Sequence, residues 1–191
     1  MKIRPYHHSD WTEWLRLSMA LFPEYSAQTL APGMEEFLSR PDAEVFVAER
    51  ADGTLAGFVE VGARPYADGC DTSPVGYIEA WYVDPDARRR GHGRALIAAA
   101  EAWALARGYR EMASDALLDN AVSHAAHKRL GYEEVDRVVQ FRKVLPDAQR
   151  AAAPTPPNAG RRGQGLYCFA SGVRRRKRFT RRTAWAITCV S

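Results

Sequence analysis

The sequence predicts a mixed α/β (α+β) fold for residues 1–145, with a central sheet flanked by helices, and a separate tail in residues 146–191. Three observations support this. Strand-like and helix-like patterns alternate along the first part. An Asp-Gly pair between two β-rich runs is typical of a hairpin. From Pro146 onward Pro, Ala, Gly and Arg predominate, and such a composition cannot bury a core, so we expect this basic tail to be disordered.

The N-terminal part of the domain should contain a strand and two helices. Residues 2–6 have the composition of a short strand. Ser9 or Asp10 can cap the helix that follows, and Glu13 lies three residues after Asp10, as in a capping box. One apolar stripe at helical spacing continues this helix: Trp14, Leu17 and Leu21. A second, short helix should cover residues 33–39.

The middle of the domain is predicted to be β-rich. Residues 44–50 and 55–63 should form the two strands of the hairpin around Asp52 and Gly53. A loop should occupy residues 64–75, because it contains two prolines and a glycine. Residues 76–83 are the most strand-like run of the chain.

The C-terminal part should alternate again between helix and strand. The expected elements are a helix over residues 91–107, a short strand over 111–114, a helix from Asp119 or Asn120 to Arg129, and a final strand or hairpin over 132–145.

Residues 88–93, with the sequence Arg-Arg-Arg-Gly-His-Gly, connect a predicted strand to the start of a predicted helix. A helix N-terminus presents unpaired N–H groups and a partial positive charge, and glycine lets the backbone approach an anion closely. A nucleoside-triphosphate loop would require Lys-Ser/Thr after the glycines, and a dinucleotide-binding loop would require a third glycine where Leu96 stands. The alternative is a solvated arginine turn before a core helix.

The loop resembles the Q/R-x-x-G-x-G/A loop of the N-acetyltransferase (GNAT) superfamily, which binds the pyrophosphate of acetyl-CoA, with Arg88, Gly91 and Gly93 at the motif positions. Residues 120–132 are similar to the N-x-x-A and G-F/Y segment of that family. The resemblance covers most of residues 1–145. It implies the GNAT fold, in which a mixed sheet has splayed fourth and fifth strands, and it implies acetyl-CoA as co-substrate.

A closer resemblance is to the bacterial aminoglycoside 6′-N-acetyltransferases. It is carried by residues 69–83, 110–115 and 130–145 and by Leu21-Phe22-Pro23. It implies direct acetyl transfer to the 6′-amine of aminoglycoside antibiotics, which confers resistance, and a homodimer. A polyamine or other small amine is the alternative acceptor.

The resemblance also implies which residues bind acetyl-CoA. They belong to the end of the fourth strand, the arginine-glycine loop and the start of the last helix: Trp81, Tyr82, Val83, Arg88, Arg89, Arg90, Gly91, His92, Gly93, Arg94 and Asn120. For Trp81 and Tyr82 the alternative is that their side chains only pack in the core.

Two carboxylates are the candidates for acceptor binding and catalysis. Glu79 interrupts an apolar strand, where a charge is costly unless it is paired or faces a polar cleft. Asp115 follows the fifth strand. The resemblance implies that Glu79 binds the acceptor amine and acts as a base through water. We expect Asp115 to face Glu79 across the splay, where the paired carboxylates would attract a polycation. The alternatives are a residue on a wet sheet face for Glu79 and a turn or helix cap for Asp115.

The resemblance adds three pocket residues and one acid. Phe22, Tyr66 and Asp136 match positions that line the acceptor pocket, and Asp136 would come from the partner subunit. A Trp is common in relatives where Phe22 stands. For Phe22 and Tyr66 the alternatives are a core ring and a loop-anchoring phenol. His127 is the candidate acid for the leaving thiolate, because a neutral-range imidazole stands where many members have Tyr; the alternative is a surface histidine.

Charge is distributed unevenly along the chain. Residues 146–191 carry ten Lys/Arg and one Asp, a net charge of +9, so the remainder carries −5 of the formal total of +4. An acidic domain attracts polycationic acceptors. The basic run at residues 174–182 is the basis of a different hypothesis, a nucleic-acid or ribosome binder. We favour a dispensable extension for the tail.

Location and metal content follow from simpler patterns. The N-terminus lacks the apolar core of a signal peptide and no apolar run approaches the ~20 residues of a membrane span, so we expect a cytoplasmic protein. The three cysteines are odd in number and have no metal-ligand spacing, so no disulfide framework or metal site is expected.

Overall fold

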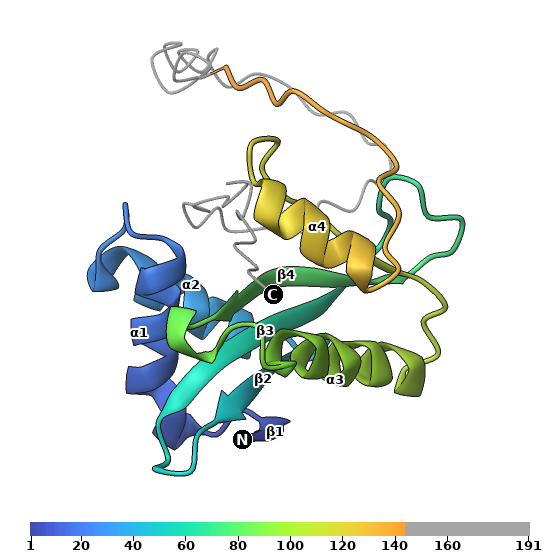
Figure 1. Cartoon of the computed structure of the whole chain (residues 1–191). Coiled ribbons are helices and arrows are strands. Elements are labelled where there is room, and N and C mark those ends of the chain that lie inside the picture. The colour runs from blue at the N-terminus through green and yellow to red at the C-terminus, as the bar shows by residue number, and fades with distance from the viewer. Residues whose placement is uncertain (144–191) are drawn as a thin grey trace, which may run out of the picture. The chain divides into compact units, whose positions relative to one another are not determined.

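The computed structural model describes residues 1–143, in which a five-stranded mixed sheet lies between helices (Figure 1). The strand order is β1-β2-β3-β4-β5. Their bounds are β1 Lys2–Pro5, β2 Ala43–Glu49, β3 Leu55–Arg64, β4 Val75–Val83 and β5 Met112–Ser114. The first four strands pair antiparallel, whereas β5 runs parallel to β4. The mixed sheet with flanking helices confirms the predicted fold class.

Four α-helices complete the described part of the chain: α1 Trp11–Leu21, α2 Ala27–Leu38, α3 His92–Ala106 and α4 Ala121–Arg129. Helices α1 and α2 cover one face of the sheet and bury residues such as Trp14 and Leu30 against Phe58. Helix α3 covers the other face, where Leu96 packs with Trp81. Apolar side chains alternate along β3 and β4 between these two cores, because successive strand residues point to opposite faces.

The start of α1 differs from the predicted capping box. Asp10 is the N-cap residue, but its side chain makes no capping hydrogen bond. Both carboxylate oxygens instead accept from Arg4, at 2.6 and 2.9 Å, and one also accepts from the His7 N–H. Glu13 accepts from the Leu55 N–H and from Arg16. The capping box was wrong because a buried bidentate arginine pair uses the Asp10 carboxylate first.

Helix α2 begins six residues earlier than predicted, at Ala27. Pro32 lies inside it, where a missing N–H is normally unfavourable. Leu30 and Met34 flank the proline at helical spacing and are both buried in the α1–α2 core. Their burial explains why the helix continues through a residue that favours a helix start.

The remaining elements match the expected ones closely, except for the last. The hairpin turns at Asp52 and Gly53, and Asn120 caps α4 by accepting from the Ser123 N–H at 3.0 Å. The final strand or hairpin was wrong over residues 132–143, which contain no strand. Glu134 is held by Lys128 and Arg137, and Val135 packs against Gly69, so the segment begins along the loop before β4 and not along the three-residue β5.

Strand β4 contains a β-bulge at Glu79. Glu60 of β3 pairs with Ala80 and Val61 pairs with Ile78, so Glu79 is an extra residue without a partner across the ladder. The parallel ladder with β5 covers only Gly76 to Ile78. The predicted splay of the fourth and fifth strands is therefore confirmed, and it opens at the bulge.

The predicted tail, residues 146–191, lies outside the described residues. Within residues 1–143, no helix combines the length and the apolar character needed to cross a membrane.

Candidate active site

The loop between β4 and α3 has backbone dihedral angles that few residue types adopt easily. Gly91, the N-cap of α3, has φ +84°, and Arg89 has φ +60°. A side chain in this left-handed region costs about 1–2 kcal/mol. Strained backbone of this kind concentrates at functional sites. The first N–H groups of α3 have no partners within the helix, as at every helix start, and they lie beside this turn.

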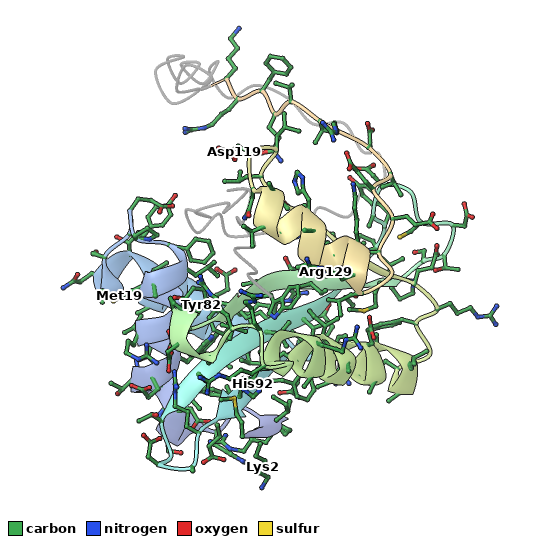
Figure 2. The ribbon with its side chains drawn as sticks, viewed as in Figure 1. Lys2, Met19, Tyr82, His92, Asp119 and Arg129 are labelled. Atoms are coloured by element: carbon green, nitrogen blue, oxygen red, sulfur yellow. The ribbon has the colours of Figure 1, made fainter. Side chains whose placement is uncertain are left out.

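A cavity of about 200 Å³ lies between the end of β4, the start of α3 and the end of α4. Its lining residues are Trp81, Val83, Arg88, Arg89, Gly91, Gly93, Arg94, Ala126, Arg129 and Leu130. Figure 2 labels His92 at the start of α3 and Arg129 at the end of α4, on either side of this space. Arginines at the rim and apolar side chains at the floor suit an anionic ligand with an apolar arm.

Gly93 allows α3 to approach the floor of this cavity. A Cβ atom on Gly93 would lie 2.9 Å from Cζ2 of Trp81. Trp81 is buried, and its Nε1–H has no hydrogen-bond partner among the described residues. A buried donor without a partner is uncommon, and a ligand in the cavity could accept from it.

Arg88 and Asp84 fix the turn that leads into the loop. The Arg88 Nε–H donates to the Val83 carbonyl at 2.9 Å, so this motif residue holds the end of β4. Asp84 is buried, and its carboxylate is paired with Arg16 and Arg50, each at 3.1 Å. These contacts tie the turn to α1 and to the end of β2.

Four of the predicted donor-binding residues do not line the cavity. Tyr82 points to the other face of the sheet, where it packs in the α1–α2 core, so its side chain follows the core-packing alternative (Figure 2). Arg90 is exposed and His92 is half-buried. Asn120 caps α4.

Glu79, a predicted acceptor-binding residue, is bound by two arginines. Arg64, at the end of β3, donates from Nε to Oε1 at 3.2 Å and from Nη2 to Oε2 at 2.5 Å. Arg40, which follows α2, lies 3.5 Å from Oε1. The Glu79 side chain is 11% exposed. A carboxylate this buried requires such partners, and neither arginine was predicted to bind it.

Asp115 is held by a phenol. The Tyr77 hydroxyl donates to Oδ1 of Asp115 at 2.6 Å. Burial raises the pKa of Tyr77 and the bond to Asp115 raises it further, so the phenol stays protonated and remains a donor. The Arg64 guanidinium lies 3.3 Å from the centre of the Tyr77 ring. Arg64 and Tyr77 thus connect the two carboxylates that the sequence placed at the site.

The three predicted pocket residues occupy different environments. Phe22 is 5% exposed and packs edge-on against Tyr25 in the α1–α2 core. Tyr66 is 66% exposed, on the loop between β3 and β4. Asp136 is exposed and accepts from the N–H of the next residue. Among the described residues, neither Tyr66 nor Asp136 forms a hydrogen bond or ion pair with Glu79 or Asp115.

His127 is largely buried and engaged at both ring nitrogens. Nδ1 lies 2.8 Å from the Ser123 carbonyl oxygen, and Nε2 lies 3.1 Å from Oγ of Ser114 on β5. Because a carbonyl only accepts, Nδ1 carries a proton, and Nε2 of the neutral ring accepts from Ser114. Burial lowers the pKa of His127, which favours this neutral form. The ring stands edge-on to Trp81 at the floor of the cavity.

Sequence reasoning missed several residues near the site. Glu60 interrupts apolar β3 as Glu79 interrupts β4, and it is 5% exposed, so the same signal could have identified it. Arg129 ends a helix with basic residues, but nothing in the sequence places it at the cavity. Arg40, Arg64 and Tyr77 act through contacts between elements that lie 13 to 39 residues apart, which no local pattern records.

The chain matches known acetyltransferases over most of the described residues. The model of the acetyltransferase (GNAT) family matches residues 8–132. The aminoglycoside N(6')-acetyltransferase type 1 of Klebsiella aerogenes is 44% identical over 147 residues, which are 75% of this chain and 96% of that protein. Its counterpart from Stenotrophomonas maltophilia is 41% identical over 144 residues, 75% of this chain and 93% of that protein.

Solved structures agree with these relatives. The aminoglycoside antibiotic 6'-N-acetyltransferase AAC(6')-IG from Acinetobacter haemolyticus, an apo structure, superposes with a TM-score of 0.72 at 37% identity, covering 76% of this chain and all of that one. AAC(6')-Iy in complex with the bisubstrate analogue CoA-S-monomethyl-acetylneamine has a TM-score of 0.71 at 36% identity, covering 75% and 98%. With this fold, this loop and these relatives, the chain belongs to the acetyltransferase (GNAT) family, among the aminoglycoside N(6')-acetyltransferases.

Proposed function

We propose that the protein transfers the acetyl group of acetyl-CoA to the 6′-amine of aminoglycoside antibiotics and thereby confers resistance. The observation that carries the proposal is the separation of β4 and β5 at Glu79. An arginine-rimmed cavity lies along β4 beyond the point where β4 and β5 separate, and Glu79 and Asp115 directly follow the last paired residues of the two strands. A donor thioester and a cationic acceptor would meet where β4 and β5 separate.

On the donor side, we assign the pyrophosphate of acetyl-CoA to the start of α3. The helix N-terminus and the guanidinium groups of Arg88, Arg89 and Arg94 provide positive charge there. Trp81 and Val83 provide the apolar floor for the pantetheine arm. Arg129 would add a cation from α4. The residues present therefore fit the co-substrate that the family uses.

On the acceptor side, we assign ammonium binding to Glu79 and Asp115. Aminoglycosides are polycations, and carboxylates in a partly desolvated site attract them strongly. The reacting amine must lose a proton before it attacks. Its nitrogen then bonds to the thioester carbonyl carbon, the carbon–sulfur bond breaks, and the thiolate leaves. The proton lost before the attack passes to a carboxylate, directly or through water, and the second proton that the nitrogen loses on becoming an amide is taken up by the thiolate or by solvent.

His127 is the candidate that returns a proton to the thiolate. Its place beside Trp81 supports this role, but the neutral ring donates its Nδ1 proton to Ser123. The role therefore requires protonation at Nε2, which burial disfavours. The pH–rate profile of His127→Phe tests the assignment: loss of the alkaline limb of kcat supports the acid role, because a general acid works only while it is protonated, and an unchanged profile contradicts that role.

We further propose a cytoplasmic homodimer. Acetyl-CoA is a cytoplasmic metabolite, and the exposed position of Asp136 is compatible with a partner subunit that uses it to complete the pocket. Sedimentation analysis across a concentration series measures the subunit number, and Asp136→Asn tests the pocket role through acceptor KM.

A panel of amines tests the proposed activity. Thiolate release is followed with kanamycin, tobramycin, spermidine and a peptide with a free N-terminus, and the acetyl group is located in the product by NMR and mass spectrometry. We expect turnover of both antibiotics with acetylation at the 6′-nitrogen. A higher kcat/KM for spermidine would favour the small-amine acetyltransferase, because two carboxylates also suit a linear polyamine. Modification at another nitrogen would contradict the proposed regiochemistry.

A further inference from the structure

We infer that Arg64 is a positioning residue that couples the two acceptor carboxylates, Glu79 and Asp115, through the ring of Tyr77. The inference rests on the proposed function, because it assigns a role within the acceptor site. No part of the arginine-glycine motif is involved. Three successive contacts support the inference, from the bulge in β4 to the residue after β5.

The first contact is the bidentate ion pair between Arg64 and Glu79. Both carboxylate oxygens accept from the same guanidinium, at 3.2 and 2.5 Å. Such a bidentate pair fixes the orientation of a carboxylate as well as its charge. Because Glu79 is the extra residue of a bulge, its backbone lacks a ladder partner, and the guanidinium supplies the constraint that the ladder does not.

Arg40 contacts the same carboxylate but cannot perform the same task. It reaches only Oε1, at 3.5 Å. Its other donors are bound to Asp42 and to the Ala63 carbonyl, each at 3.1 Å. Arg40 therefore compensates charge at Glu79 without fixing both oxygens, and among the described residues no hydrogen bond or cation–π contact joins it to Tyr77. This makes Arg40 a matched control.

The second and third contacts run through Tyr77. The Arg64 guanidinium stacks on its ring at 3.3 Å, where the negative face of the ring attracts a cation. The hydroxyl of the same ring donates to Asp115 at 2.6 Å. Tyr77 is 7% exposed, so it has little freedom to move independently of either neighbour. A displacement of Arg64 is therefore transmitted to the phenol and to Asp115.

The arrangement gives the two carboxylates different roles. The Glu79 charge is compensated by a guanidinium, whereas Asp115 accepts only from a neutral phenol among the described residues. Asp115 thus retains a net negative charge for an acceptor ammonium. Glu79 also contacts the acceptor, but because its charge is compensated it contributes less attraction, and with Arg64 it fixes the geometry in which the Asp115 charge is presented.

A double-mutant cycle tests the coupling. Arg64→Met keeps the stem of the side chain and removes the bidentate ion pair, and Tyr77→Phe keeps the ring and removes the bond to Asp115. We expect each single change to lower kcat/KM for tobramycin about tenfold and the double variant to be no worse than either single within about twofold, because both break one path. The KM for acetyl-CoA should stay within about twofold of the parent value throughout.

The control cycle pairs Arg40→Met with Tyr77→Phe, and here the two effects should multiply. Multiplication in the Arg64 cycle, or an equal change in acetyl-CoA KM, would overturn the inference. If Arg64→Met does not fold, as judged by its melting curve, Arg64→Lys takes its place in the same cycle, because lysine keeps the cation and loses the bidentate pair. Acetylation of tobramycin at a nitrogen other than 6′ would refute the proposed function but not this inference. The mutant cycle could still be measured on whichever nitrogen is acetylated.

Discussion

The donor side and the acceptor side of the site are built in different ways. The donor cavity takes most of its lining from one continuous stretch, residues 81–94, and depends on backbone features such as the left-handed Gly91 and the close approach of Gly93 to Trp81. The acceptor side joins single side chains from the ends of β3 and β5, the middle of β4 and the turn after α2. The first is a property of local backbone geometry, and the second is a property of charge pairing across the fold.

The largest effect that this comparison predicts is on the acceptor side. Asp115→Asn should lower kcat/KM for the acceptor about 100-fold, as is typical when one charge of a desolvated pair is removed, and leave acetyl-CoA KM nearly unchanged. The matched control is Asp119→Asn, an exposed residue four positions later that carries the same charge. Equal losses in the two variants would show that only the overall charge matters.

A smaller effect should appear on the donor side. Gly91→Ala places a side chain at φ +84° and should raise acetyl-CoA KM roughly tenfold while acceptor KM is retained, since about 1–2 kcal/mol of backbone strain is introduced at the cavity rim. Gly108→Ala is the control, because Gly108 has φ +80° and equally open surroundings at the other end of α3. Both variants should lose similar stability, measured by urea unfolding. A KM change in the control would contradict a local role for Gly91.

His127 lies between the two sides, and its protonation should affect stability. Burial lowers its pKa in the folded protein below the ordinary value of 6.5, so on acidification the unfolded chain binds the proton first. The free energy of unfolding should therefore decrease as the pH falls below about 6.5, and this contribution should be fully present above that value. In His127→Phe, Tm should change less between about pH 7.5 and pH 5. A slope identical to that of the parent would show that His127 does not contribute.

The smallest expected effect concerns the tail, residues 146–191, which lies outside the described residues. A chain ending at Leu145 should retain kcat/KM for both substrates within about twofold, because the relatives align with about three quarters of this chain. The truncated protein should also lose any salt-dependent retention on a nucleic-acid column that the full chain shows. Lost turnover would mean that the tail takes part in the reaction.

The contrast also explains what could be predicted from the sequence. The loop at Gly91, the hairpin at Asp52 and the cap at Asn120 were predictable because each depends on a few neighbouring residues. Glu79 was recognisable as a charge in an apolar strand. The partners of Asp10 and Glu79 were not, because Arg4, Arg40 and Arg64 reach them through the folded chain. The final strand was wrong for a related reason: its apolar residues favour β-structure, but Glu134 and Val135 are held by contacts with α4 and with the loop before β4 that no local pattern records.

The bulge at Glu79 adds one residue to β4 without changing how the strand packs in the two cores. On either side of it, Ile78 packs in the α3 core and residues 80–83 alternate between the two cores, and Ile78 and Ala80 already pair with consecutive residues of β3. A strand without residue 79 would therefore retain a regular pleat and the same packing. Glu79 is in effect an insertion into a complete strand, so the hydrophobic scaffold does not dictate which residue occupies this position.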